Sequence, residues 1–297
     1  MRSFRFGFNI RSIRPGEAIA ATCRAAERWG YHVALLPDHV GRNRPAPFPM
    51  LVAVAACSER LRVGPFVLNV GFWNPMLLAR EAATTDQLIG GRLELGLGAG
   101  HMRSEFDAAG IAWQPLPDRV RRLEALIQDL DRLFGDEAEG YDTRQRPRPP
   151  LLVAGTGDGT LRLAAQHADI VGYSGTLQVR GRPPGTLRIV SATEMDERVS
   201  FFRSEAGERA DRIEANLLVQ VVVVTAERRR AAAELATELG SELTPEQVLE
   251  APSVLIGTVP EIVRQLQERR QRWGVSYVCV HEPYLDAFGP VVEALRE

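Results

Sequence analysis

The sequence predicts a (β/α)8 TIM barrel. Eight apolar runs have the length and composition of buried strands, and each is followed by a stretch whose apolar residues recur at helical spacing. The predicted strands begin near residues 4, 32, 62, 93, 151, 169, 217 and 276. Buried parallel strands that alternate with helices are typical of α/β folds, and eight such units are the number in one closed barrel.

Four of these units fall in the first hundred residues. Strands are predicted at 4–10, 32–36, 62–68 and 93–97, and helices at 15–29, 50–58 and 75–89. Gly30 follows the first helix, where glycine often supplies the left-handed conformation that ends a helix. The fourth strand ends on Gly96, Gly98 and Gly100. Because glycine has no side chain, a ligand can approach the backbone closely there.

The second half continues the alternation with two interruptions, after strands 4 and 6. Strands are predicted at 151–154, 169–173, 217–225 and 276–281; helices at 118–134, 159–167, 226–239, 245–250, 260–273 and 285–296; and a loop at 256–258. Residues 174–196 contain many glycines and prolines and little periodicity, which indicates a surface insertion that could act as a lid. We expect residues 1–297 to form one domain.

A doubly wound sheet is the alternative fold. Its first strand-to-helix turn would carry the glycine fingerprint of a dinucleotide site, and residues 9–15 lack it. The turn at 155–159 reads GxGxG instead of GxGxxG. The barrel is therefore preferred, and this turn is a weak candidate for holding a phosphate.

Composition excludes several classes of function. All 36 Lys and Arg residues are arginine, which rules out Schiff-base, pyridoxal-phosphate and phosphate-loop lysine chemistry. The net charge is −2 and the arginines are dispersed, so we expect no nucleic-acid partner, and no apolar run is long enough to predict a membrane span. The three cysteines have no paired spacing, so we expect no disulfide framework, no metal site and a cytoplasmic location.

Barrel enzymes carry their active sites at the carboxyl ends of the strands. The polar and glycine residues expected there are Asn9, Asp38, His39, Asn69, Gly98, Gly100, His101, the turn at 155–159, Ser174, Gly175, Gln220, His281 and Glu282. The aromatic residues Phe72, Trp73, Trp113 and Tyr173 are expected around the same mouth. They favour a small, hydrophobic substrate.

Several runs along the chain resemble a known family. They are Asp38-His39, Asn74-Pro75, the run from Arg80 to Leu88 (REAATTDQL), the run from Gly90 to Gly100 (GGRLELGLGAG), the run from Arg119 to Glu124 (RVRRLE), the run from Ala168 to Gly172 (ADIVG) and the run from Ile256 to Ile262 (IGTVPEI). Together they resemble the luciferase-like monooxygenase superfamily, most of all its branch of F420-dependent oxidoreductases. The resemblance spans nearly the whole chain.

The resemblance implies a barrel that binds coenzyme F420 or FMN at its mouth, commonly as a homodimer. It also implies a non-proline cis peptide at the end of the third strand that supports the cofactor ring, and the matching bond is Leu68-Asn69. His39 matches a residue that faces the reactive edge of the ring. A sugar-phosphate branch carries a catalytic Glu where this chain has His101, which argues against the same substrate.

These arguments give a set of predicted roles. Proton transfer is expected from His39 or His101, with Asp38 beside them. The cofactor ring is expected at Leu68, Asn69, Gly98 and Gly100. Its phosphate is expected where a helix begins, at Gly155, Thr156, Gly157, Thr160 and Ser174. Each role has a structural alternative: a loop hydrogen bond, a tight turn or simple exposure. Arg119 and Arg122 could contact a phosphate or form salt bridges.

The predicted function is hydride transfer between F420 and a small, hydrophobic organic substrate. One alternative is an FMN-dependent monooxygenase that works with a separate flavin reductase. A second is a non-catalytic flavin-binding protein, because a fold alone does not establish chemistry.

Overall fold

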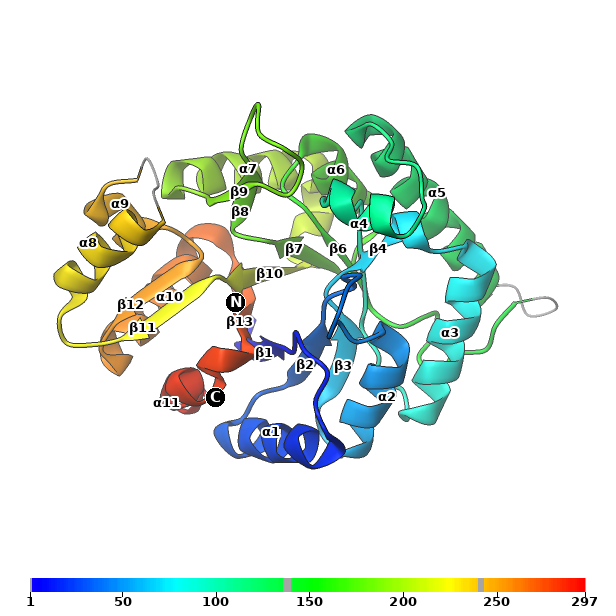
Figure 1. Ribbon diagram of the computed structural model, residues 1–297, viewed down its shortest axis with the longest axis horizontal. Coiled ribbons are helices and arrows are strands. Elements are labelled where there is room, and N and C mark those ends of the chain that lie inside the picture. Colours follow the sequence, from blue (N-terminus) through cyan, green and yellow to red (C-terminus); the bar gives the residue numbers. More distant parts are fainter. Residues whose placement is uncertain (1, 136–139, 240–242, 297) are drawn as a thin grey trace.

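The computed structural model describes residues 2–135, 140–239 and 243–296. A parallel barrel occupies its centre (Figure 1). The barrel strands are β1 (Arg5–Asn9), β2 (Val33–Leu36), β3 (Arg62–Pro65), β5 (Leu95–Gly98), β6 (Leu151–Ala154), β7 (Ile170–Tyr173), β10 (Glu214–Val219) and β13 (Val275–His281). Each begins within a few residues of a predicted strand, so the predicted fold class is confirmed.

Helices surround the barrel (Figure 1). They are α1 (Gly16–Trp29), α2 (Pro47–Ala56), α3 (Pro75–Leu88), α5 (Leu116–Gly135), α6 (Asp158–His167), α7 (Ala192–Ala206), α10 (Val259–Trp273) and α11 (Leu285–Ala294). Local sequence fixes their ends. The Asn74 side chain accepts from two amides at the start of α3, and Gly30 ends α1 with φ 93°. No helix in the described ranges is long and apolar enough to cross a membrane.

The third strand is interrupted, and its two parts together close the barrel by pairing with different neighbours. Its first part, β3, pairs with β2, and its second part, β4 (Leu68–Asn69), pairs with β5. The non-proline cis peptide lies between them, at Phe66-Val67. The expected position, Leu68-Asn69, is wrong, because those two residues keep regular strand backbone in order to pair with Leu97 and Gly98.

The predicted strand at 217–225 is two strands. β10 ends at Val219, and β11 (Val221–Val224) leaves the barrel to pair with β12 (Val254–Gly257), where a loop was predicted. These two strands, α8 (Arg228–Glu238) and α9 (Pro245–Glu250) form a side lobe that Figure 1 shows beside the barrel. The side lobe has its own apolar cluster, which includes Ala232, Leu235, Val248 and Val254.

The segment predicted as an insertion forms a short hairpin. β8 (Thr176–Gln178) pairs with β9 (Leu187–Ile189), and α7 begins soon afterwards because Ser191 and Glu194 form a capping box. A methyl group at Gly185 would lie 3.3 Å from Met102 Cγ. The hairpin therefore reaches the loop that carries His101. Shorter elements complete the description: α4 (Arg103–Ala108), η1 (Val70–Phe72), η2 (Gly207–Asp211) and η3 (Glu282–Tyr284).

An ion-pair network lies near the amino ends of the strands. Arg5 and Arg62 both reach Glu94 Oε1, at 2.6 and 2.8 Å, and Arg5 also reaches Glu214 at 3.1 Å. In a (β/α)8 barrel this end has a structural role, whereas ligands bind at the opposite end. The candidate site is therefore built from the carboxyl ends of the strands.

Candidate active site at the barrel mouth

The structure brings His39 and His101 together at the barrel mouth. His39 follows β2 and His101 follows β5, and their ring centroids are 5.7 Å apart with the planes at 81°. Burial is the main reason that the pKa of His101 lies below its ordinary value, and the neighbouring charge of His39 adds to the effect. Both effects favour the neutral form of the His101 ring. Two imidazoles can thus face one ligand.

Glu105 on α4 completes this group. Its Oε1 lies 2.8 Å from His39 Nδ1, and Glu105 is only 8% exposed. A carboxylate accepts hydrogen bonds, so Nδ1 carries the hydrogen and Nε2 remains to exchange a proton with a ligand. Sequence analysis assigned no role to Glu105. The sequence signal that could have pointed to Glu105 was its position next to Phe106, in the first turn of the helix that follows the glycine loop.

Asp38 holds the loop after β4. Its Oδ2 accepts from the Asn69 amide at 3.1 Å and from Trp73 Nε1 at 2.8 Å. Burial raises the pKa of Asp38, and these two hydrogen bonds oppose that rise. Both of these bonds go to the loop instead of to His39. The geometry thus favours a positioning role for Asp38.

The residues predicted to hold the cofactor ring also converge. β4 places Leu68 and Asn69 beside Gly98 of β5. A methyl group at Gly98 would lie 2.6 Å from Val67 Cγ2, and one at Gly100, which has φ 75°, would overlap the Asn69 side chain. Glycine is therefore required at both positions by close approach of neighbouring side chains. These contacts supply a structural reason for the glycines in addition to the predicted one.

The turn at 155–159 leads into α6. Gly157 is the N-cap residue, and no side chain caps the helix there. The first amides of a helix lack partners within the helix and favour an anion. Arg198 binds the carboxylate of Asp158 in the first turn, which offsets its negative charge. The arrangement fits a phosphate, although Ser174 donates its hydroxyl to Thr176 O at 3.1 Å.

Gly157→Val is expected to weaken cofactor binding about tenfold, which corresponds to about 1.4 kcal/mol. Gly157 has φ −78° and ψ 150°, and no atom lies within 4 Å of an added methyl group. Valine therefore fits the apoprotein and obstructs only a ligand. Titration with the cofactor and thermal unfolding of the apoprotein would measure the two effects. A parallel fall in melting temperature would show instead that the turn is structural.

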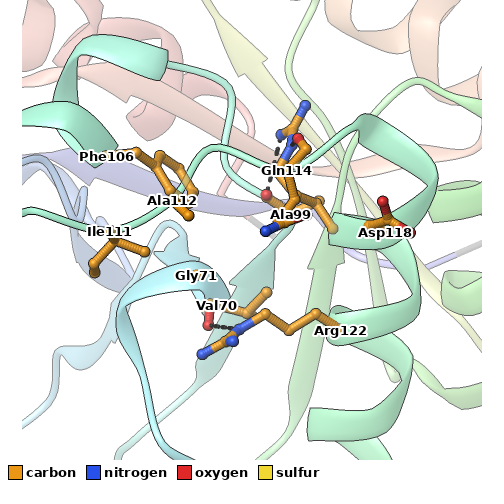
Figure 2. A pocket seen from close by; sticks show the side chains of 10 residues that line it. Val70, Gly71, Ala99, Phe106, Ile111, Ala112, Gln114, Asp118 and Arg122 are labelled. Carbon is orange, nitrogen blue, oxygen red and sulfur yellow. Dashed lines mark hydrogen bonds between the residues drawn. The ribbon is translucent and has the colours of Figure 1, made fainter.

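Arg119 and Arg122 brace the loops from α5. Arg119 donates to Ala99 O and Gly100 O, and its guanidinium lies 4.0 Å from the centre of the Trp113 ring. Arg122 donates to Val70 O at 3.0 Å. Figure 2 shows the cavity that they border, about 290 Å³ in volume, with Phe106 and Ile111 on its opposite side. Both arginines are thus committed to main-chain carbonyls, a role that sequence reasoning did not consider.

The aromatic residues predicted around the mouth pack mainly on protein. Tyr173 is 1% exposed and its ring meets Phe202 of α7, so its prediction as a mouth residue is wrong. Parallel strands are buried on both faces, and residue 173 points outward to the helices. Trp113 contacts Phe106, whose ring also contacts Phe72. The case for an aromatic-lined substrate pocket is correspondingly weaker.

His281 lies at the end of β13, and its pKa is lowered to about 4, mainly by burial and also by Arg11. As the pH falls from about 6.5 to 4, the unfolded chain takes up a proton that the folded protein does not. We expect this group to reduce the free energy of unfolding by up to about 3 kcal/mol over that range. Urea unfolding of wild type and His281→Asn at pH 7 and 4.5 checks this: the variant should lose less stability, and equal losses would contradict it.

Comparison with known proteins identifies the family and supports the fold. Residues 5–277 match the family model described as luciferase-like monooxygenase. The chain is 26% identical to an F420-dependent glucose-6-phosphate dehydrogenase of Nakamurella multipartita over 295 residues, covering 92% of this chain and 83% of that protein. It is 28% identical to an FMNH2-dependent dimethylsulfone monooxygenase of Pseudomonas putida over 163 residues, covering 48% and 45%.

A solved F420-dependent secondary alcohol dehydrogenase, in complex with an F420-acetone adduct, shares the fold with a TM-score of 0.75. Its sequence is 16% identical, and the match covers 100% of both chains. Because the family model matches most of the chain and the fold agrees throughout, the chain belongs to the luciferase-like monooxygenase family.

Proposed function

We propose that this protein is an oxidoreductase that transfers a hydride between coenzyme F420 and a small organic substrate. The observation that carries the proposal is the pair of partly exposed His39 and buried Glu105 beside His101 at the barrel mouth. Hydride transfer to or from a carbonyl or an activated double bond requires a companion proton. The pair supplies a proton-exchanging group where the family resemblance places the ring.

The extent of similarity favours F420 over FMN. The match to the F420-dependent relative covers 92% of this chain, whereas the match to the FMNH2-dependent relative covers 48%. The residues present also fit a phosphate-bearing cofactor: the α6 N-terminus has no side-chain cap, and the space around Gly157 is open. When bound, the cofactor would supply the two-electron chemistry.

In the proposed reaction, the residues of the protein transfer the proton and hold the loops of the site in place. Glu105 keeps His39 Nδ1 engaged, so that Nε2 can donate a proton when His39 is charged and accept one when it is neutral. Asp38 fixes the loop that follows β4 through Trp73 and Asn69. A reaction in the opposite direction would use the same groups in reverse.

Titration of the purified apoprotein with F420 and, separately, with FMN tests the choice of cofactor. We expect binding of F420 and weak or absent binding of FMN. Micromolar binding of FMN with no binding of F420 would contradict the proposal. The same titration with Gly157→Val reports whether the α6 turn takes part.

An FMN-dependent monooxygenase with a separate reductase is the second candidate. It is favoured by the similarity of about half the chain to FMNH2-dependent and flavin-dependent monooxygenases. Substrate-dependent oxygen consumption with enzymatically reduced FMN would support it. With F420 bound instead, no such consumption is expected.

We also propose that the protein is a cytoplasmic homodimer. The family resemblance supports the dimer, and unpaired cysteines support a reducing compartment. Light scattering coupled to size exclusion would give the mass to compare with 32.8 kDa per chain. A mass of one chain at working concentration would contradict the dimer.

A further inference from the structure

A chain of three residues fixes the orientation of His281 at the mouth. Gln220 Nε2 donates to the Ser174 carbonyl at 2.7 Å, and Gln220 Oε1 lies 3.2 Å from His281 Nε2. A carbonyl only accepts hydrogen bonds, so the Gln220 amide nitrogen must face Ser174. Its oxygen then faces His281, and His281 Nε2 must carry the hydrogen.

The other ring nitrogen, His281 Nδ1, is therefore a lone-pair acceptor. It is buried, and among the residues that the structure describes it has no hydrogen-bond partner. A buried acceptor that has left water without gaining a donor destabilises the folded protein. A ligand that brings a donor to this nitrogen would recover that free energy.

Asn9 stands beside His281 on the neighbouring strand. The two residues are register partners in the parallel pair of β1 and β13, so their side chains point to the same face of the sheet. That face is the barrel interior, because Phe8, the neighbour of Asn9, packs outward on Tyr31. Asn9 is 4% exposed, and its Oδ1 has no partner within the described part of the chain.

We propose that His281 and Asn9 form a substrate subsite that accepts a hydrogen bond from a hydroxyl or N–H group of a neutral substrate. The inference rests on the proposed function, in which this mouth holds the reacting molecule. It defines the substrate class further: an uncharged molecule with a hydrogen-bond donor, positioned by β1 and β13 opposite the strand ends that carry the histidine pair.

The lone pair on His281 Nδ1 favours a hydrogen-bond donor over an anion, and it does so even though the positive charge of Arg11 lies nearby. Burial and the nearby charge of Arg11 lower the pKa of His281 to about 4, so the ring is neutral at pH 7. A neutral lone pair repels a carboxylate or phosphate oxygen, and such an anion would lose its hydration without gaining a donor at Nδ1. A hydroxyl or N–H group would instead donate a hydrogen bond to Nδ1. Substrate choice here depends on hydrogen-bond polarity instead of on charge.

NMR of the full-length protein labelled with [15N]histidine tests the subsite directly. The chain has five histidines, and His281→Asn identifies the His281 signals by their loss. We expect the ring of His281 in the Nε2–H form at pH 7. Gln220→Leu should release this preference, so that the Nδ1–H form appears, while His167→Asn, a change at the end of α6, should leave it intact.

Two probes of nearly equal shape then test recognition: cyclohexanol, which has a donor, and methoxycyclohexane, which has none. With F420 bound, cyclohexanol should shift the His281 Nδ1 resonance and the ether should not. Equal responses to both probes, or none to cyclohexanol, would overturn the subsite. A shift produced by F420 alone that blocks the alcohol would also overturn it, because the donor would then belong to the cofactor.

The two proposals fail in different ways. If F420 does not bind but cyclohexanol still shifts His281 Nδ1, the cofactor assignment is wrong and the subsite stands. If F420 binds with no selective response to the alcohol, the subsite alone is wrong. In turnover assays His281→Phe should raise KM for a hydroxylated substrate about tenfold relative to its methyl ether, with F420 affinity unchanged.

Discussion

Replacing His39 with asparagine is expected to lower the turnover number about 100-fold or more, because a positioned proton donor or acceptor contributes at least that factor. Cofactor affinity should change little, since asparagine retains a polar side chain of smaller size at the same loop. His101→Asn should lower turnover as well, and the double variant His39→Asn/His101→Asn should abolish it. Steady-state kinetics with bound F420, together with a cofactor titration of each variant, would measure both quantities.

Glu105 provides a graded version of this test. Glu105→Gln keeps an oxygen that can accept from His39 Nδ1, whereas Glu105→Leu removes it, so turnover should fall further in the leucine variant. A purely structural role for Glu105 would lower melting temperature without separating the two variants in turnover. His167 is a partly exposed histidine at the end of α6, so His167→Asn is the matched control and should behave as wild type. Unchanged turnover in the His39 and His101 variants would remove both residues from the mechanism.

Gly96→Ala is expected to destabilise the protein by about 3 kcal/mol, at the upper end of the usual cost of overpacking. A methyl group at this position would overlap the main-chain carbonyl of Pro65, and β3 would have to move away from β5. A side chain could rotate aside, but this backbone is held by pairing with β2. The loss should therefore appear as a lower melting temperature and a lower urea midpoint.

Gly157→Ala is the control for that experiment, because nothing lies within 4 Å of the added methyl group. It should change the free energy of unfolding by less than about 1 kcal/mol. Similar losses in the two variants would show that the approach of β3 to β5 does not govern the effect. Wild-type stability in Gly96→Ala would mean that the third strand can shift without opening the barrel.

The barrel could be predicted because its signals are local. Each strand is a short apolar run and each helix has apolar residues at helical spacing, and these patterns depend on neighbouring residues only. The break at Gln220 left no such signal, because Val221–Val224 has the same strand character whether it pairs within the barrel or with β12. Strand partners are set by tertiary packing, and propensity does not report them.

For the candidate site, the sequence could indicate which residues lie at the strand ends but not which of them contact one another. Residues at the ends of strands could be named, and the structure brings His39 and His101 together from loops 62 residues apart. Tyr173 was misplaced because both faces of a parallel strand are apolar. The pairing of Glu105 with His39, like the link from Ser174 through Gln220 to His281, depends on contacts between distant loops that sequence spacing does not encode.

Where β11 leaves the barrel, hydrogen bonds connect the side lobe to the barrel. Gln220 and Val221 both donate their amides to Ser253 O, and the Ser253 hydroxyl donates to Gly175 O at 3.0 Å. The side lobe therefore joins the barrel at the residue whose amide group orients His281. Sequence change in the lobe can therefore reach His281 through Ser253 and Gln220, which lie apart from the His39–Glu105 pair.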